Sequence, residues 1–343
     1  MKAAILYKIK DIRIEDIEKP TIKPDEALVR VKSVGVCGSD VHYYLHGRIG
    51  DQIVKDRHIL GHEPAGEIVE VGKEVKNLKV GMRVAVEPGI SCGHCEQCKK
   101  GRYNICKDVK FLGTPPVPGA YREYLAYPAK FLYPIPDSVS YAEGSLVETL
   151  SVGMYAVELA GLNVGDDIAI IGCGPIGLVT LESVKSAGAG RIFMTDMINQ
   201  RLKFAKKHGV DSAIDAQKEN VVEKIMDLTK GRGVDIVFEC ASSVDTLKQS
   251  IEMVATGGKI IWIGIPPEDY VSIPVHTVRR KEIVIKAVRR FKHSYPKCIN
   301  AIAGGKVSVK DMVTHNFQLE DITKAFSLVE NYADGVIKAM INI

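Results

Sequence analysis

Four cysteines that fall close together in the sequence could hold a metal ion. They follow the spacing C-x2-C-x2-C-x7-C on a Gly- and Lys-containing segment, at Cys92, Cys95, Cys98 and Cys106. Four thiolates can surround one tetrahedral zinc ion, and a site closed by four protein ligands has no position left for a substrate. A bacterial iron–sulfur run has a shorter last spacing followed by a proline, and neither is present here. The quartet therefore predicts a structural zinc site.

A glycine-rich turn in the second half of the chain predicts a dinucleotide site. The apolar run DDIAIIG leads into Gly172, Gly174 and Gly177, and Asp196 ends the next apolar run nineteen residues after Gly177. These glycines suit a tight turn, a close approach of backbone to a pyrophosphate, and helix packing on a strand. An acidic residue at Asp196 would bind the adenosine ribose and repel the extra phosphate of NADP. FAD sites share the fingerprint but usually begin near the amino terminus, so NAD is favoured.

Two different patterns of apolar residues along the chain predict two domains. Val-rich alternating runs between residues 25 and 90 indicate a small, irregular all-β unit. From about residue 150, strands such as RIFMTD, VDIVFEC and GKIIWIGI alternate with helical stretches, which indicates a parallel doubly wound sheet ending at EIVIKAV. We expect the tail to form helix, loop and helix without further βαβ units and to return to the first domain. The predicted domains are residues 1–150 with 291–343, and residues 151–290.

Composition narrows the class of protein. The 343 residues carry 46 Lys plus Arg against 42 Asp plus Glu, a net charge of +4 without a basic block, so nucleic acid is not an expected partner. Lys8, Lys10 and Arg13 interrupt the amino-terminal segment, and no later stretch reaches membrane-spanning length. We therefore expect a cytoplasmic protein without a membrane partner. The isolated Cys173, Cys240 and Cys298 are interpreted as plain thiols.

A second metal site would have to be assembled from separated residues. The candidates are Cys37 in VGVCGSDVHYY, His62 and Glu63 in GHEPAGEIVEVG, and Glu148 in SLVETLSVG. Together with the cysteine quartet and the GCGPIG turn, these motifs have the order and spacing of the zinc-containing medium-chain alcohol and polyol dehydrogenases, which the chain resembles over essentially its whole length. The runs VGVCGSDVHYYLHGRIG, EPG, GRYN and VTHNFQLED resemble the sorbitol dehydrogenases in particular.

The resemblance implies an α/β protein with a Gly/Val-rich, GroES-like β-barrel domain and a Rossmann domain. It also implies NAD as cofactor, two zinc ions per chain, one catalytic and one structural, and a homo-oligomer, either a dimer or a tetramer. Cys37, His62 and one of the two glutamates, Glu63 or Glu148, would hold the catalytic zinc. Many alcohol dehydrogenases of the family have a second Cys at the position of Glu148, whereas polyol dehydrogenases have this glutamate.

The resemblance also implies which residues transfer the proton, bind the substrate and contact the cofactor. Ser39 and His42 match the proton relay of the wider family. Substrate hydroxyls would meet Tyr43, Phe111, Thr114, Glu148 and Arg290. Cofactor contacts would come from Gly172, Gly174, Pro175, Ile176, Gly177, Asp196, Arg201, Ile263, Gly264, Ile265, Val288, Arg289 and Arg290. Arg289 is a departure, because the family commonly has an aromatic residue there, and a second cation at this position would enlarge or charge the pocket.

These expectations converge on an enzyme that transfers hydride from a secondary hydroxyl of a polyol, such as sorbitol, xylitol or galactitol, to NAD. One alternative is a broad secondary-alcohol or 2,3-butanediol dehydrogenase with the same zinc machinery, because fold and metal do not fix the substrate. Another is a non-catalytic nucleotide-binding protein, against which the intact set of candidate ligands argues. For the oligomer, the strand IIWIGI and the following VSIPVHTV could pair with their copies across a two-fold axis.

Overall fold

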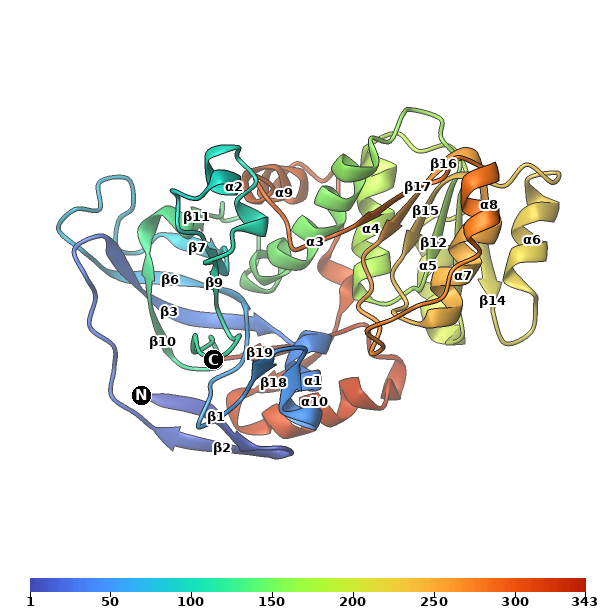
Figure 1. Ribbon diagram of the computed structural model, residues 1–343. Coiled ribbons are helices and arrows are strands. Elements are labelled where there is room, and N and C mark those ends of the chain that lie inside the picture. The colour runs from blue at the N-terminus through green and yellow to red at the C-terminus, as the bar shows by residue number, and fades with distance from the viewer. The chain divides into compact units, whose positions relative to one another are not determined.

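The computed structural model describes all residues 1–343, which form two compact units (Figure 1). Unit 1 comprises Met1–Glu148 and Tyr295–Ile343, and unit 2 comprises Thr149–Ser294. The boundary between Glu148 and Thr149 falls inside one continuous helix, α3 (Tyr141–Ala160). The candidate metal ligands belong to unit 1, and the glycine-rich turn belongs to unit 2.

Unit 1 is built around a seven-stranded sheet. Its strand order is β11-β7-β6-β3-β19-β18, and β10 also pairs with β3. The central strand β3 is apolar and buried along most of its length, as expected for a strand covered on both faces. The strands are β3 (Glu26–Gly35), β6 (Glu63–Val71), β7 (Arg83–Val86), β10 (Tyr124–Pro128), β11 (Leu132–Pro134), β18 (Val313–Gln318) and β19 (Lys338–Asn342).

Shorter elements surround this sheet. Three strand pairs lie outside it, namely β1 (Lys2–Lys8) with β2 (Asp11–Asp16), β4 (Arg48–Ile49) with β5 (Gln52–Ile53), and β8 (Gly89–Ile90) with β9 (Lys110–Phe111). The helices of unit 1, apart from the start of α3, are α1 (Gly38–His46), α2 (Glu96–Lys99), α9 (Tyr295–Ala303) and α10 (Ile322–Glu330). Helix α1 follows β3 directly, so the end of the central strand delivers Cys37 to the start of a helix.

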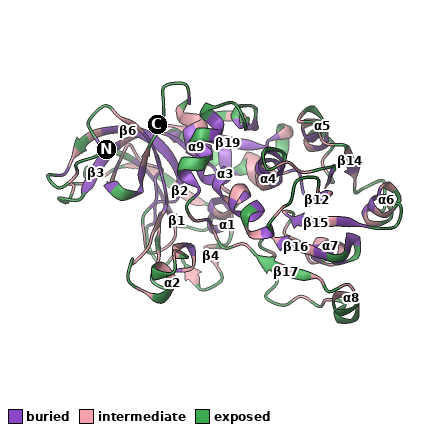
Figure 2. Ribbon diagram, turned by 90° about the horizontal axis from the view of Figure 1, so that it is seen from above, coloured by how far each residue is buried: buried purple, intermediate pink, exposed green.

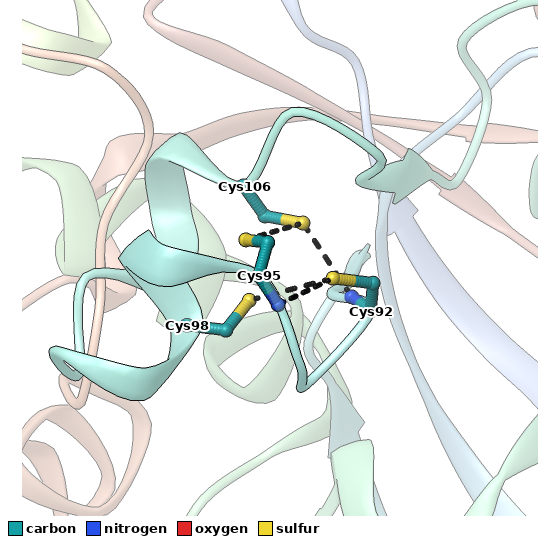
Figure 3. A group of neighbouring side chains, drawn as sticks. All are labelled: Cys92, Cys95, Cys98 and Cys106. Atoms are coloured by element: carbon teal, nitrogen blue, oxygen red, sulfur yellow. Dashed lines mark hydrogen bonds between the residues drawn. The ribbon is translucent and has the colours of Figure 1, made fainter.

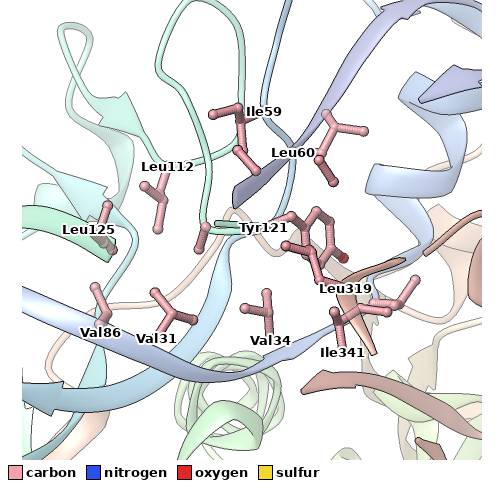
Figure 4. Packing of buried hydrophobic residues seen from close by; sticks show 14 of the residues in the cluster. Val31, Val34, Ile59, Leu60, Val86, Leu112, Tyr121, Leu125, Leu319 and Ile341 are labelled. Carbon is pink, nitrogen blue, oxygen red and sulfur yellow. The ribbon is translucent and has the colours of Figure 1, made fainter. Parts of the chain in front are cut away.

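The carboxyl-terminal tail differs from our expectation of helix, loop and helix. It forms α9, β18, α10 and β19, and β18 and β19 are parallel, so the prediction of no further βαβ unit was wrong. The two strands are short, and β18 alternates exposed and half-buried residues without a fully buried position. Their pairing is set by β3, to which β19 is antiparallel. Figure 4 shows Leu319 and Ile341 of the tail packed near Val34 and Tyr121.

Unit 2 contains a six-stranded parallel sheet, which confirms the predicted doubly wound architecture. The order is β14-β13-β12-β15-β16-β17, and the direction of winding reverses between β12 and β15, the place where such sheets bind ligands. The strands are β12 (Ile168–Ile171), β13 (Ile192–Asp196), β14 (Ser212–Asp215), β15 (Val234–Glu239), β16 (Val254–Trp262) and β17 (Val284–Ala287). The helices are α4 (Pro175–Ser186), α5 (Asn199–Lys207), α6 (Val221–Leu228), α7 (Val244–Met253) and α8 (Val275–Arg280).

One detail of the expected oligomer contact is corrected by the sheet order. The residues IIW of IIWIGI belong to β16, which is hydrogen-bonded to β15 on one side and to β17 on the other. This strand has no free edge to offer a second chain. The edge is β17, most of whose residues are exposed (Figure 2).

The packing of α10 into unit 1 generates a stability prediction. Phe326 is fully buried, and its ring meets Tyr44 and Tyr121 edge-on, with centroid distances of 5.3 and 5.9 Å. Phe326→Ala should lower the free energy of unfolding by about 3–5 kcal/mol, because it removes a large buried ring and leaves a cavity. Urea unfolding measures this loss. The exposed Lys324→Ala on the same helix is the control and should change stability by less than about 0.5 kcal/mol; equal stabilities would contradict the placement of the tail in this core.

Candidate zinc and nucleotide sites

Three side chains of unit 1 that could bind a metal ion lie close together. Cys37 precedes the first turn of α1, while His62 and Glu63 lie at the start of β6. One ligand atom from each of the three lies within 4.8 Å of the other two, and His62 and Glu63 are buried. Sulfur, imidazole nitrogen and carboxylate oxygen are the donors that zinc takes in proteins. The trio therefore fits a zinc ion with a coordination position to spare.

Asp40 holds His62 in a defined orientation. It is buried in the first turn of α1, and its Oδ1 lies 3.4 Å from His62 Nδ1. The same carboxylate accepts hydrogen bonds from the N–H of Gly61 at 3.1 Å, the N–H of Cys37 at 3.2 Å and the hydroxyl of Tyr121 at 3.0 Å. An acidic partner on one imidazole nitrogen leaves the other available to a metal and fixes the ring.

The charges of this group shift its pKa values. Burial alone would lower the pKa of His62, but the nearby charges of Asp40 and Cys37 raise it well above its ordinary value. Burial likewise opposes the charge of Asp40, but His62 and the backbone N–H donors hold the pKa of this carboxyl below its usual range. Asp40 and Tyr121 are not among the residues predicted from the sequence. The signal for Asp40 was its position three residues after Cys37, where a capping residue bonds back to the start of a helix.

Glu63 forms a buried ion pair with Lys338 of β19. The ammonium lies 2.7 and 2.6 Å from the two carboxylate oxygens, and the two side chains are only 2% and 1% exposed. Burial opposes the charge of Lys338, but Glu63 keeps its pKa raised. Gly35 provides the space, because a Cβ there would lie 1.9 Å from Glu63 Oε2. The tail of the chain thus anchors a candidate metal ligand, which sequence reasoning did not foresee.

Glu148 lies outside the compact trio, but the charged groups around the trio shift its pKa. It is buried within α3, and burial, reinforced by the charge of Glu63, raises the pKa of Glu148 to about 7 despite the opposing charges of His62 and Lys338. A buried carboxyl group of this kind is stabilised as an anion when a further cation is present. The structure therefore separates the two candidate glutamates, with Glu63 in the trio and Glu148 beside it.

The other residues predicted for unit 1 lie on two segments. Ser39, His42 and Tyr43 belong to α1, and the buried Tyr43 donates its hydroxyl to Gln52 Oε1 at 3.2 Å. The ring of Phe111 lies against His62, with a centroid distance of 5.5 Å. Thr114 lies on the loop that follows β9, and this loop packs closely on the backbone of Gly61. Arg290 belongs to unit 2.

The four cysteine sulfurs converge on one point (Figure 3). All four are free thiols whose sulfurs lie within 4.8 Å of one another. The Cys92–Cys98 and Cys95–Cys106 sulfurs are 3.9 Å apart, against about 3.8 Å between sulfurs in a tetrahedron with Zn–S bonds of about 2.3 Å. The N–H of Cys98 lowers the pKa of Cys95 to about 6, whereas burial raises that of Cys98 to about 12. The quartet fits a closed zinc site.

The glycine-rich turn of unit 2 has the backbone that a dinucleotide site requires. Gly172 has φ +99°, a conformation that favours glycine, and a Cβ on Gly177 would lie 1.8 Å from the Gly172 carbonyl oxygen. Gly174 precedes α4, and Pro175 is its first residue. The free N–H groups at the start of this twelve-residue helix make it a suitable site for phosphate.

Asp196 and a second loop flank this turn. The Asp196 carboxylate accepts hydrogen bonds from the N–H of Cys173 at 2.7 Å and of Ile198 at 2.8 Å. On the other loop, the Ile265 N–H donates to Ser242 Oγ at 3.0 Å, and Glu239 accepts the Ser242 N–H at 2.8 Å. Glu239 and Ser242, which were not predicted from the sequence, therefore position the segment from Ile263 to Ile265.

Three further predicted cofactor residues have defined positions in unit 2. The guanidinium of Arg201 lies near Gly174, since a Cβ on that glycine would be 3.4 Å from Arg201 Nη1. Val288 follows β17 and donates its N–H to the Trp262 carbonyl oxygen at 2.8 Å. Arg290, two residues later, has φ +55°.

Comparison with known proteins shows the family to which the chain belongs. The model of the alcohol dehydrogenase GroES-like domain matches residues 23–137, and that of the zinc-binding dehydrogenase matches residues 175–304. The sorbitol dehydrogenase of Bacillus subtilis is 42% identical over 99% of this chain and 97% of its own length. This chain belongs to the zinc-dependent medium-chain dehydrogenases, sorbitol dehydrogenase type.

Two other relatives agree with this assignment. The L-arabinitol 4-dehydrogenase of Aureobasidium melanogenum is 42% identical over 93% of this chain and 88% of its own length. The crystal structure of an Escherichia coli oxidoreductase of unknown specificity, 40% identical, superposes with a TM-score of 0.96 and covers 100% of this chain and 99% of that chain. These matches confirm the predicted family and its GroES-like and Rossmann folds. None of the helices of this dehydrogenase has the length and apolar character needed to cross a membrane.

The buried pair of Lys338 and Glu63 generates a prediction for the dehydrogenase. Lys338→Met keeps the length of the side chain but leaves the Glu63 carboxylate buried without its partner, which should cost about 3–5 kcal/mol of unfolding free energy in the zinc-free protein. Denaturant unfolding after mild chelation measures this loss. The double variant Lys338→Met/Glu63→Gln is the control and should recover most of it.

Adding zinc distinguishes the two glutamates. If Glu63 is a ligand, the positive charge of the ion should reduce the cost of Lys338→Met, because the carboxylate regains a partner. A cost that is equal with and without zinc would contradict ligation by Glu63.

Proposed function

We propose that this chain oxidises a secondary hydroxyl of a small polyol, such as sorbitol or xylitol, to the ketose, with NAD as the hydride acceptor and one zinc ion at Cys37, His62 and Glu63. The observation that carries the proposal is this trio, in which His62 and Glu63 are buried, with Glu148 beside it, in a chain 42% identical to a sorbitol dehydrogenase. The butanediol alternative is not favoured, because the relatives named above that have a stated substrate act on polyols.

Proximity and charge support the proposed ligand assignment. Glu63 supports the third position because its carboxylate lies within 4.8 Å of the donor atoms of Cys37 and His62. Its Lys338 partner balances one negative charge without removing the carboxylate from the trio. Glu148, whose pKa is about 7 without a metal, is proposed to lie next to the open position. There it can accept a hydrogen bond from substrate or replace Glu63.

The chemistry divides between the two cofactors and the protein. Zinc with an open coordination position is a Lewis acid that makes a nearby hydroxyl easier to deprotonate, and the nicotinamide accepts the hydride. We propose that Ser39, two residues after Cys37, receives the hydroxyl proton and that His42 passes it to solvent. Burial and the neighbouring His46 keep the pKa of His42 below its ordinary value, so the ring is neutral near pH 7 and can accept a proton.

The cofactor and substrate contacts are proposed from the same arrangement. The start of α4 and Asp196 favour NAD, because the residue after Asp196 is an exposed methionine with no charge to bind an added phosphate. Substrate hydroxyls would meet Tyr43, Phe111, Thr114, Glu148 and Arg290. The wider proposal is an enzyme with two zinc ions per chain, working in the cytoplasm as a dimer or tetramer and without nucleic-acid or membrane partners.

A panel of alcohols tests this function. With NAD, kcat/KM on sorbitol or xylitol should exceed that on 2,3-butanediol by at least about tenfold, because a site built to bind several hydroxyls rejects an alcohol that lacks them. The same panel with NADP should give lower kcat/KM throughout. Equal kcat/KM on butanediol and on every polyol would refute the polyol assignment and leave the zinc dehydrogenase chemistry standing.

The number of zinc ions tests the two-site reading. Metal analysis of the parent protein should find two zinc ions per chain, and Cys98→Ser should retain about one, with reduced stability, because a closed tetrahedral site has lost one of its four ligands. Cys298→Ser, a buried cysteine outside both candidate sites, is the control and should retain two. A parent protein with a single zinc would show that one of the two sites is not a zinc site.

A further inference from the structure

Helix α1 carries two histidines, and the proposed proton relay uses only the first of them. His42 and His46 are four residues apart, so they lie one turn apart on the same face of the helix. Their ring centroids are 4.6 Å apart, with an angle of 55° between the ring planes. His42 is half-buried and His46 is exposed. The pair therefore opens to solvent at the carboxyl-terminal end of the helix.

Neither imidazole has a polar partner elsewhere in the protein. His42 and His46 contact each other, and neither has a hydrogen bond or ion pair to another residue. The buried histidines of unit 1 differ in this respect, because His58 bonds to the Gly113 carbonyl oxygen and His62 lies beside Asp40. The ring nitrogens of His42 and His46 thus remain available to a ligand from solution.

The chemistry of this arrangement is that of a metal chelate. Two imidazoles at positions i and i+4 of a helix can place one nitrogen each on the same ion, as in helical zinc motifs. Imidazole nitrogen suits Zn²⁺, Ni²⁺ and Cu²⁺, whereas Mg²⁺ and Ca²⁺ prefer oxygen ligands. Burial and His46 lower the pKa of His42 from its ordinary value, which favours the neutral ring that binds metal.

We propose that His42 and His46 form a surface site for a divalent transition-metal ion, separate from the two candidate zinc sites, and that its occupation takes His42 out of the proton path. The second half of this statement rests on the proposed relay function of His42. The site makes the enzyme subject to inhibition by an excess of the same metal that it needs. Mg²⁺ and Ca²⁺ should not act in this way.

Binding is tested on the zinc-loaded enzyme by calorimetric titration with Ni²⁺ and with Zn²⁺. The parent should bind one ion beyond its resident zinc, and His46→Gln should weaken this extra binding at least about tenfold, as losses at a metal site commonly do. His46 is exposed, so the variant should fold normally. His276→Gln, which removes an exposed histidine on α8, is the matched control and should bind like the parent. Equal extra binding by the parent and His46→Gln would overturn the site.

Turnover tests the second half of the proposal. Added Zn²⁺ or Ni²⁺ should inhibit the parent and His276→Gln reversibly on dilution, whereas His46→Gln should need at least about tenfold more metal for the same fractional loss of its own turnover. Inhibition that is equal in all three proteins would overturn the link to this site. Extra binding that is lost in His46→Gln, without any inhibition of the parent, would uphold the metal site but overturn the proposed effect on His42. A parent protein without polyol turnover would instead point to failure of the proposed function, with the calorimetric result unaffected.

Discussion

The need to balance buried charge governs the arrangement of unit 1. Asp40, Glu63 and Lys338 are each at most 2% exposed, and charged groups at such depth are costly unless they are paired. Asp40 is satisfied by His62 and by three hydrogen-bond donors, and Glu63 by Lys338. These pairs connect α1, the start of β6 and the last strand of the chain. The requirement therefore ties together segments that lie hundreds of residues apart in the sequence.

This constraint explains why the tail belongs to unit 1. Strand β19 lies against β3, and its first residue is Lys338, so strand pairing brings the ammonium to Glu63. Gly35 at the end of β3 has no side chain, which leaves room for the Glu63 carboxylate. Without zinc, the Glu63 carboxylate is balanced by Lys338 alone. A zinc ion bound to the trio would share this carboxylate with Lys338. The ligand set and the packing of the tail are then energetically coupled.

Sequence reasoning succeeded where the signal was local. The cysteine quartet lies within fifteen residues, and its spacing alone predicts the convergence seen in the structure. The glycine turn and Asp196 are fixed by one strand–helix–strand unit, and their geometry follows from backbone conformation. The doubly wound sheet was predicted for the same reason, since each βα unit carries its own pattern of apolar residues.

Reasoning from the sequence failed where a residue acts through a distant partner. Nothing near Lys338 marks it as the partner of Glu63, and Tyr121 is indistinguishable from an ordinary core tyrosine until its hydroxyl is seen on Asp40. The strands β18 and β19 are short, and β19 acquires its position by pairing with β3, so their sequences alone do not define them. Glu239 is similar, because its role in holding a loop depends on Ser242 and Gly264.

Helix α1 shows how one short element can serve several roles. Its buried residues are Asp40, Val41, Tyr43 and Tyr44. Asp40 orients a candidate ligand, and the other three fill the core. Ser39, His42 and His46 are separated by three and four residues, so they form one stripe on the helix, and exposure increases along it from half-buried to exposed.

The stripe on α1 begins next to the candidate ligand Cys37 and ends at the surface. A path that lets a proton leave must offer groups that are unpartnered, polar and reachable by water. Those same properties make His42, the solvent-facing member of the proposed path, accessible to a metal ion that the adjacent His46 would also bind. The capacity to release a proton and the susceptibility to excess metal therefore arise from one helical face.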